Sequence, residues 1–161
     1  MILNLVILAF VTLERLGELW LSNRNTRRLL AQGAHEVAPG HYPLIIAVHV
    51  LWLAALWWFA PWQRIDALWL AIFILLELAR LWVVLSLGER WTTRIIMLPG
   101  APLVRRGPYR WMRHPNYWVV IGEVAVLPLA FHLPSVALIF SLLNAAVLAI
   151  RIPSENRALR S

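Results

Sequence analysis

Long apolar runs joined by polar connections are the dominant pattern along the chain. Three runs, over residues 1–21, 42–60 and 65–87, have the roughly 20 residues that a helix needs to cross a bilayer. Two further apolar runs cover residues 115–130 and 134–152. The pattern predicts an all-α, polytopic membrane protein with five transmembrane helices.

The last two runs are separated only by residues 131–133. A connection this short joins antiparallel neighbours, so we expect a tight helical hairpin whose first helix can end or kink at Pro128. The chain is then predicted to form a single membrane domain over residues 1–161. Residues 1–87 supply three membrane helices, and residues 88–161 supply a loop, the hairpin and a tail.

Composition supports a membrane setting, because hydrophobic residues make up 61% of the chain and charged residues only 14%. A single soluble domain of this size could not bury so much apolar surface. The mean hydropathy of +0.68 agrees with this interpretation. We therefore expect the lipid bilayer itself to be the main partner of the chain.

The positive charge gives the predicted bundle a direction. All 15 basic residues are Arg, and twelve of them fall in connections on one side of the predicted helices. These twelve are Arg24, Arg27, Arg28, Arg90, Arg94, Arg105, Arg106, Arg110, Arg113, Arg151, Arg157 and Arg160. The positive-inside rule makes that side cytoplasmic, with the N-terminus outside and the C-terminus inside. Because these arginines lie on three separate connections, the net charge of +7 indicates a membrane face and no nucleic-acid partner.

Several polar side chains fall within the apolar runs, where each needs a partner or a water-filled cavity. Glu77 and Arg80 are three residues apart and can pair on one helix. Glu14 and Glu18 share a helix face near the cytoplasmic end, where we expect snorkelling or a link to loop arginines. For Glu123, a supporting role beside a site and plain packing both remain open.

Two histidines and the missing cysteines bear on metal chemistry. His49 and His132 fall at different predicted depths, so they make a poor pair of haem ligands. The chain has no cysteine, which excludes thiolate metal sites and a cysteine nucleophile. We expect no metal site.

Residues 107–117 carry the most informative motif, Gly-Pro-Tyr-Arg-Trp-Met-Arg-His-Pro-Asn-Tyr. Pro115 fits the first turn of a helix, which places His114 near the N-cap and leaves free N–H groups that favour an anion. Arg113 adds a positive group, and the neighbouring aromatic rings can face a cation. The motif would suit a ligand with a carboxylate, a flat ring and a sulfonium. Composition alone would equally describe an ordinary interfacial belt, so the order of the residues decides.

That order resembles the isoprenylcysteine carboxyl methyltransferase family, whose hallmark is Arg-His-Pro-x-Tyr, then a membrane hairpin, then an acidic pair. Residues 113–117 match the first element in full, and the acidic pair aligns with Glu155 and Asn156, of which only Glu155 is acidic. Further similarity covers residues 87–92 and 107–110, so the resemblance extends over about 87–159. The short length and the ending resemble the small bacterial branch, whose members methylate lipid-like phenols such as alkylresorcinols and alkylpyrones.

The resemblance implies a methyltransferase that uses S-adenosylmethionine and places its site at the cytoplasmic face of a bacterial inner membrane. The implied cofactor-binding residues are Gly107, Tyr109, Arg110, Arg113, His114, Tyr117 and Glu155. Arg151 and Glu155 are the candidate catalytic residues, and they share a helix face if the fifth helix continues past Pro153. We expect Arg151 to orient the acceptor and Glu155 to assist proton removal or cofactor binding.

The expected acceptor is an amphiphilic small molecule that presents a carboxylate or phenolic oxygen at the interface. Two alternatives stay open. One is methylation of a phospholipid amine or a small thiol, and the other is a non-catalytic membrane subunit whose arginine loop binds lipid head groups.

Overall fold

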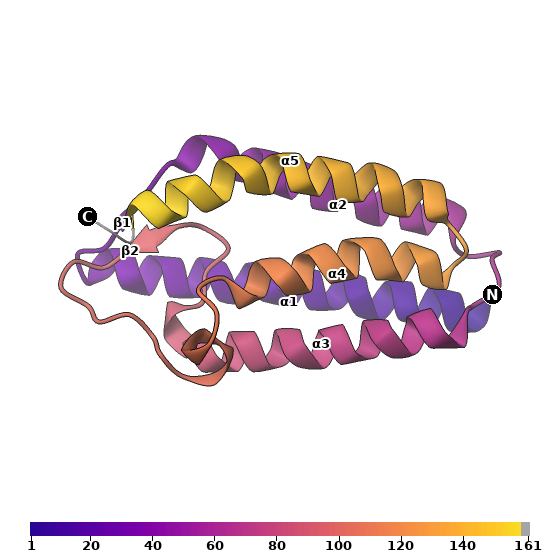
Figure 1. Ribbon diagram of the computed structural model, residues 1–161, viewed down its shortest axis with the longest axis horizontal. Helices are drawn as coiled ribbons and strands as arrows, with labels where there is room; N and C mark the ends of the chain where they lie inside the picture. Colours follow the sequence, from indigo (N-terminus) through magenta and orange to yellow (C-terminus); the bar gives the residue numbers. More distant parts are fainter. Residues whose placement is uncertain (159–161) are drawn as a thin grey trace.

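A computed structural model describes residues 1–158 as an elongated bundle of five helices (Figure 1). Arg160, counted above among the arginines of the tail, lies outside the described residues. The helices are α1 (Ile2–Ala31), α2 (Tyr42–Phe59), α3 (Ala67–Leu87), α4 (Pro115–Ala130) and α5 (Pro134–Ala158). Three short 3₁₀ helices lie between them: η1 (Pro39–His41), η2 (Gly88–Arg90) and η3 (Gly107–Arg110). The strands β1 (His35–Glu36) and β2 (Ile96–Met97) pair antiparallel.

The ends of the helices follow from local chemistry. The Asp66 carboxylate accepts hydrogen bonds from the backbone N–H groups of Leu68 and Trp69, at 2.9 and 3.2 Å, and so caps α3. Proline occupies the first position of α4 and of α5, where the missing N–H costs no helix hydrogen bond. The helices α3, α4 and α5 therefore each begin at a residue that favours a helix start, an N-capping Asp for α3 and a first-turn Pro for α4 and α5.

Helix α4 is the shortest of the five and lies at the centre of the bundle. Ten of its 16 residues are buried, against two of 18 in α2 and four of 21 in α3. It packs on α3 and on α5, while the outward faces of α1, α2, α3 and α5 expose large apolar side chains. Leu68, Leu75 and Leu142 are each more than 60% exposed, which suits a lipid-facing surface.

The apolar core fills the half of the bundle remote from the long loop. The buried Trp52 indole N–H donates to the Val124 carbonyl oxygen at 3.2 Å, which ties α2 to α4. The Asn4 amide donates to the carbonyl oxygens of Ala60 and Gln63, each at 2.8 Å. These bonds satisfy buried polar groups where α1 begins, at the end of the bundle that also holds the short turns.

A buried ionic cluster lies in the middle of the bundle. Arg15 of α1 contacts Glu18, Glu77 and Glu123 at 3.0, 3.3 and 3.0 Å. Arg80 of α3 contacts Glu123 at 2.7 Å and Glu18 through two of its nitrogens. The cluster therefore joins α1, α3 and α4, and it decides the question left open for Glu123 in favour of ion pairing inside the bundle.

The long loop between α3 and α4 is held against the far end of α1. The Asn25 amide donates to the carbonyl oxygens of Gly88 and Trp91, at 3.1 and 2.8 Å. The Thr93 backbone N–H donates to Ser22 Oγ at 2.8 Å. This half of α1 is thus helical because its polar side chains bind the loop.

The predicted helices correspond to those observed, and the two large differences lie at the C-terminal ends of α1 and α5. Helix α1 continues ten residues beyond the predicted apolar run, and α5 continues through Pro153 to Ala158. Pro128 lies inside α4, which ends two residues later. The expected pair of Glu77 with Arg80 does not form. Glu77 contacts Arg15 instead, and Arg80 contacts Glu18 and Glu123 on neighbouring helices.

Three helical segments among the described residues are long and apolar enough to cross a membrane. They are Pro39–Phe59, Ala67–Arg90 and Pro134–Arg157, and Pro115–Ala130 is a shorter apolar helix. The start of α1 and the last described turn of α5 lie at opposite ends of the bundle (Figure 1). Five spans with the N-terminus outside stay a prediction.

Candidate active site

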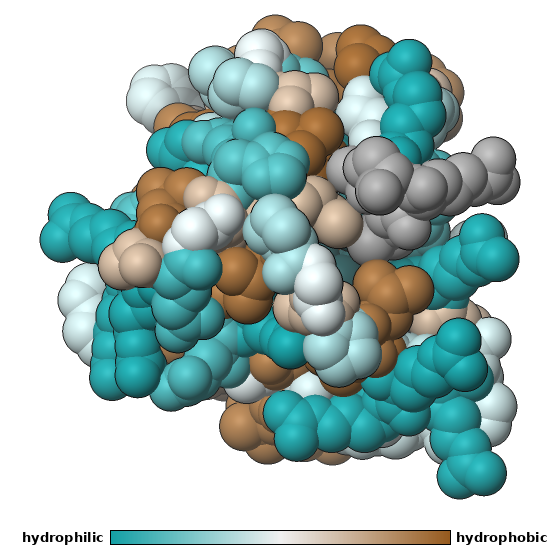
Figure 2. Space-filling view, turned by 90° about the vertical axis from the view of Figure 1, so that its left-hand side faces the viewer, coloured by the Kyte–Doolittle hydropathy of each residue, from teal (hydrophilic) through white to brown (hydrophobic). Residues whose placement is uncertain are grey.

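The polar loops gather at one end of the bundle. The strand pair, the loop from η2 to η3 and the end of α5 all lie there (Figure 1). Viewed from that end, hydrophilic side chains dominate the surface and hydrophobic ones lie between them (Figure 2). Arg94 binds both carboxylate oxygens of Glu36, at 3.0 and 3.1 Å, and so joins β1 to the segment just before β2.

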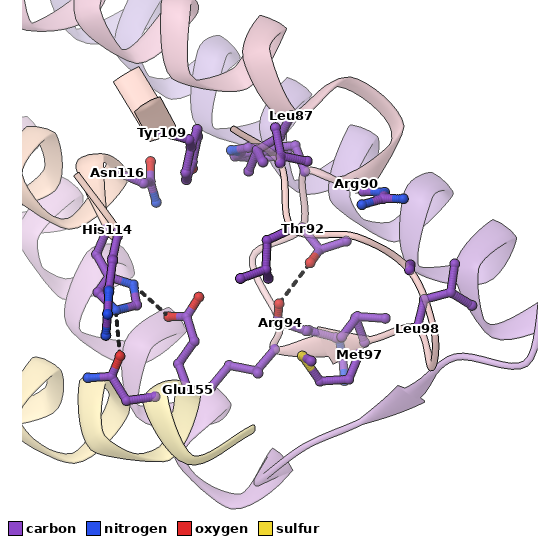
Figure 3. Close-up of a pocket in the computed structure, with 18 of the residues that line it drawn as sticks. Leu87, Arg90, Thr92, Arg94, Met97, Leu98, Tyr109, His114, Asn116 and Glu155 are labelled. Carbon is purple, nitrogen blue, oxygen red and sulfur yellow. Dashed lines mark hydrogen bonds and ion pairs between the residues drawn. The ribbon is translucent and has the colours of Figure 1, made fainter. Parts of the chain in front are cut away.

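A cavity of about 510 Å³ opens among these loops. Figure 3 looks into it, and the side chains around the open space come from η3, from the start of α4, from α5 and from the loop after α3. Those labelled there include Tyr109, His114, Asn116, Glu155, Thr92 and Leu98. Its volume lies within the range of about 300–1,000 Å³ that small-molecule sites occupy.

Hydrogen bonds join Arg151, Tyr117 and Glu155 at the cavity wall. We call these three residues and the neighbouring His114 the interfacial network. Arg151 Nε donates to the Tyr117 hydroxyl at 2.7 Å, and that hydroxyl donates to a Glu155 oxygen. Arg151 also donates through Nη2 to the Thr93 carbonyl oxygen at 2.6 Å. Because α5 continues past Pro153, Arg151 and Glu155 share one face, as the spacing predicts.

His114 completes this network from the N-cap of α4. Its Nδ1 lies 3.5 Å from the same Glu155 oxygen, and its Nε2 lies 2.9 Å from Asn156 Oδ1. An amide oxygen only accepts, so this contact requires that His114 Nε2 donates. Asn156 therefore still accepts a hydrogen bond from His114, although it lacks the negative charge of the second acidic residue in the family pattern.

Tyr109 stays a neutral phenol in this setting. Burial, and then the negative charge of Glu155, raise the pKa of the Tyr109 hydroxyl above its ordinary value of about 10. The group is accordingly available to donate a hydrogen bond at physiological pH.

Most of the predicted site residues surround one cavity. Those that line it are Tyr109, Arg113, His114, Tyr117, Arg151 and Glu155. Gly107 and Arg110 do not line it. Gly107 has φ of +56°, and an added Cβ would lie 2.0 Å from Ser86 Oγ, so this glycine lets η3 approach α3 closely.

The cavity also contains residues that the sequence did not single out. Asn116, Thr92 and the apolar Leu98 line it, as does Met97 of β2. Asn116 stands inside the Arg-His-Pro-x-Tyr motif at its variable position, which gave no signal. Residues 92–98 reach the site through the pairing of β2 with β1. The paired residues are about 60 positions apart in the chain, so the sequence gives no local sign of this contact.

A second, smaller cavity of about 210 Å³ lies among the helices. Trp91, Asn116, Tyr117 and Arg151 line both cavities, so the two spaces lie side by side at these residues. Two polar atoms of this shared wall, Arg151 Nη1 and Asn116 Oδ1, are buried and have no hydrogen-bond partner within residues 1–158. Buried polar groups in folded proteins almost always have partners, so these atoms can bind water or a ligand.

The larger cavity fits S-adenosylmethionine in chemistry as well as in size. Arg113 and the first turn of α4 suit a carboxylate, and Tyr109 and Tyr117 offer aromatic faces to a sulfonium. Apolar residues such as Leu98 suit a flat ring, and Glu155 suits an ammonium or ribose hydroxyl. No group of metal-binding side chains occurs within the described residues.

The chain is thus an apolar helical bundle with a polar cavity at one end and a second cavity between the helices beside it. The model of the isoprenylcysteine carboxyl methyltransferase (ICMT) family matches residues 69–161. The chain therefore belongs to this family of membrane methyltransferases, which use S-adenosylmethionine.

Two relatives extend the similarity over nearly the whole chain. An uncharacterized protein named YpbQ from Bacillus subtilis (strain 168) is 33% identical over 96% of this chain and 95% of its own length. An uncharacterized protein of Haemophilus influenzae is 29% identical over 90% of this chain and 88% of its own. No solved structure matches the chain.

Proposed function

We propose that this protein transfers the methyl group of S-adenosylmethionine to a carboxylate or phenolic oxygen of an amphiphilic acceptor. The cofactor would enter the larger cavity from the cytoplasm, and the acceptor would reach the smaller cavity from the bilayer. The arginine-rich loop end, which the positive-inside rule assigns to the cytoplasm, supports this orientation.

The observation that carries the proposal is that the two cavities share part of their lining. A methyl transfer needs the donor carbon and the acceptor oxygen in line and in contact, so the two binding spaces must be adjacent. The shared lining includes Asn116, Tyr117 and Arg151, beside Glu155 and His114 of the larger cavity. A lipid head-group site on a non-catalytic subunit would need no second cavity at this place.

Bound S-adenosylmethionine would supply an electrophilic methyl group on a sulfonium. In the chain, Arg151 holds the acceptor oxygen through its unpartnered Nη1, while Tyr117 and Thr93 fix its other nitrogens. When the acceptor is a phenol, its proton passes to the Glu155 carboxylate, which accepts a hydrogen bond from the Tyr117 hydroxyl. A carboxylate acceptor requires no proton transfer, and Arg151 then acts by orienting the anion.

The decisive experiment measures cofactor binding and methyl transfer together on the detergent-solubilised protein. Calorimetry should detect S-adenosylhomocysteine binding, and radiolabelled S-adenosylmethionine should label a lipid-soluble product in a membrane extract. Glu155→Gln should lower transfer at saturating cofactor about 100-fold or more, because general-base catalysis contributes that much.

Glu89→Gln is the matched control. Glu89 is exposed, pairs with Arg28 and does not line either cavity, so its neutralisation should leave transfer unchanged. Absence of any heat with S-adenosylhomocysteine would contradict the enzyme proposal and favour the non-catalytic alternative. If the label appears instead on a phospholipid amine or a thiol, the acceptor is one of these groups and not an oxygen.

A further inference from the structure

The lining of the larger cavity is strongly positive, although the cofactor proposed for it is a cation. It contains five arginines and a single acidic side chain, that of Glu155. The arginines are Arg90, Arg94, Arg105, Arg113 and Arg151. In S-adenosylmethionine the carboxylate and the ammonium offset each other at neutral pH, so the sulfonium leaves a net positive charge. Because like charges repel each other, the cavity needs a negative group close to the sulfonium.

The negative groups at this end of the bundle are largely engaged. Arg94 binds the Glu36 carboxylate and is the one arginine of the lining with a carboxylate partner within residues 1–158. The Tyr117 hydroxyl donates to a Glu155 oxygen, and His114 Nδ1 lies 3.5 Å from the same oxygen. Glu155 therefore offsets only part of the positive charge, and a further negative atom would favour binding of the sulfonium.

Asn116 supplies such an atom at the wall that the two cavities share. It is the second residue of α4, and its Oδ1 is buried without a hydrogen-bond partner within residues 1–158. Figure 3 shows its amide at the edge of the open space, on the same side as Tyr109 and His114. The last side-chain torsion of an asparagine is broad. Since no hydrogen bond fixes Oδ1, the carbonyl end of the amide can turn toward a cofactor in the larger cavity.

The other residues of the shared wall cannot take this role. The reacting methyl group has to lie at this wall, because it passes from a cofactor in one cavity to an acceptor in the other. The side chains of Trp91 and Arg151 only donate hydrogen bonds. The Tyr117 hydroxyl oxygen already accepts one from Arg151, at 2.7 Å. Among the four residues that line both cavities, Asn116 is thus the one whose side chain offers an oxygen without a partner within residues 1–158.

Resting on the function proposed above, we infer that Asn116 selects the charged cofactor over its neutral product by presenting its carbonyl oxygen to the sulfonium. The C–H groups bonded to a sulfonium are polarised by its charge, and contacts of C–H groups with a carbonyl oxygen are weakly attractive. Transfer of the methyl group leaves a neutral thioether, so S-adenosylhomocysteine loses this attraction. Asn116 therefore favours release of the product relative to binding of fresh cofactor.

Calorimetry on the detergent-solubilised protein tests the inference through the ratio of two Kd values, for S-adenosylmethionine and for S-adenosylhomocysteine. Asn116→Leu removes the carbonyl oxygen at similar side-chain size. It should weaken binding of S-adenosylmethionine about fivefold and change binding of S-adenosylhomocysteine less than about twofold. Asn116→Asp places a full negative charge at the same position. It should shift the ratio the other way, by about fivefold or more in favour of S-adenosylmethionine, because an ionised acceptor is stronger than a neutral one.

Trp118→Leu is the control on the same helix, since Trp118 is 65% exposed and lies outside both cavities, and it should leave both Kd values unchanged. The ratio compares two ligands on one sample, so a smaller folded fraction does not alter it. Equal weakening of both ligands by Asn116→Leu would overturn the inference, as would an unchanged ratio in Asn116→Asp. If Asn116→Leu does not fold, Asn116→Asp decides alone. Binding of neither ligand to the wild type would overturn the proposed function itself.

Discussion

Two networks of arginines and acidic groups lie close together in this bundle and differ in how far their carboxylates are exposed. The interfacial network contains Tyr117, and the ionic cluster contains Glu123, six residues further along α4. Six residues correspond to about 9 Å of helix. Each network keeps buried polar atoms without a partner within residues 1–158: Arg15 Nε and Glu123 Oε1 in the ionic cluster, and Arg151 Nη1 in the interfacial network.

The difference separates a network that holds the fold from one that can bind a ligand. Glu123 has 3% of its side chain exposed and Arg80 has 7%, whereas Glu155 has 27% exposed beside a cavity. A deeply buried network resists change because each charge depends on the others. A partly exposed network beside a cavity can exchange one of its contacts for a contact with a ligand or water.

The largest expected effect is on stability, in the ionic cluster. Arg80→Met removes the partner of Glu18 and Glu123 and should lower the free energy of unfolding by about 3–5 kcal/mol. Thermal unfolding in detergent measures the loss. A variant as stable as the wild type would show that the cluster is not what holds α1, α3 and α4 together.

Next in size is the effect of Arg151→Met, which should appear in activity. Loss of a charged hydrogen-bond donor should lower kcat/KM for the acceptor about 10- to 100-fold. Binding of S-adenosylhomocysteine, followed by calorimetry, should change far less. Arg157→Met on the same helix is the control, because Arg157 is exposed and outside both cavities.

Tyr117→Phe should have a smaller effect, a fall of about tenfold in kcat. It leaves Arg151 in place but removes the hydroxyl that links it to Glu155, and one such bond is worth about 1 kcal/mol. Tyr42→Phe removes a hydroxyl bonded to Thr93 Oγ1 at 3.0 Å, outside both cavities, and should leave kcat unchanged. Equal effects of the two substitutions on kcat would argue against a special role for the Tyr117 hydroxyl.

The smallest effect is expected at the surface pair of Arg28 and Glu89, whose side chains are 47% and 70% exposed. Arg28→Met should change the free energy of unfolding by less than about 1 kcal/mol, because exposed ion pairs are screened by water and salt. The same unfolding measurement, repeated at high salt, checks this. A loss as large as that of Arg80→Met would remove the distinction between buried and exposed pairs.

Sequence reasoning predicted the helices well where apolar length and prolines define them. The range 115–130 was predicted as observed, and so was the start of α5 at Pro134. It missed the last ten residues of α1, because Ser22 and Asn25 look like loop residues until the loop that they bind is in place. Secondary structure that depends on such distant partners carries no local signal.

The candidate site residues could be picked out from the sequence only where a motif or an alignment marked them. The motif supplied His114 and Tyr117, and the alignment of the tail supplied Arg151 and Glu155, all of which line one cavity. Spacing also predicted that Glu77 pairs with Arg80, but neighbouring helices brought closer partners to both. Local spacing identifies residues that share a helix, and it contains no information about which helix faces them.

The position of Glu123 on the buried α4 has a consequence for how the protein is made. Chains emerge from the ribosome from the N-terminus onward. Arg15 and Arg80, the partners of Glu123, belong to helices that are synthesised before α4. The carboxylate is thus synthesised after both of its counter-ions, so its partners are already present in the chain when α4 packs into the bundle.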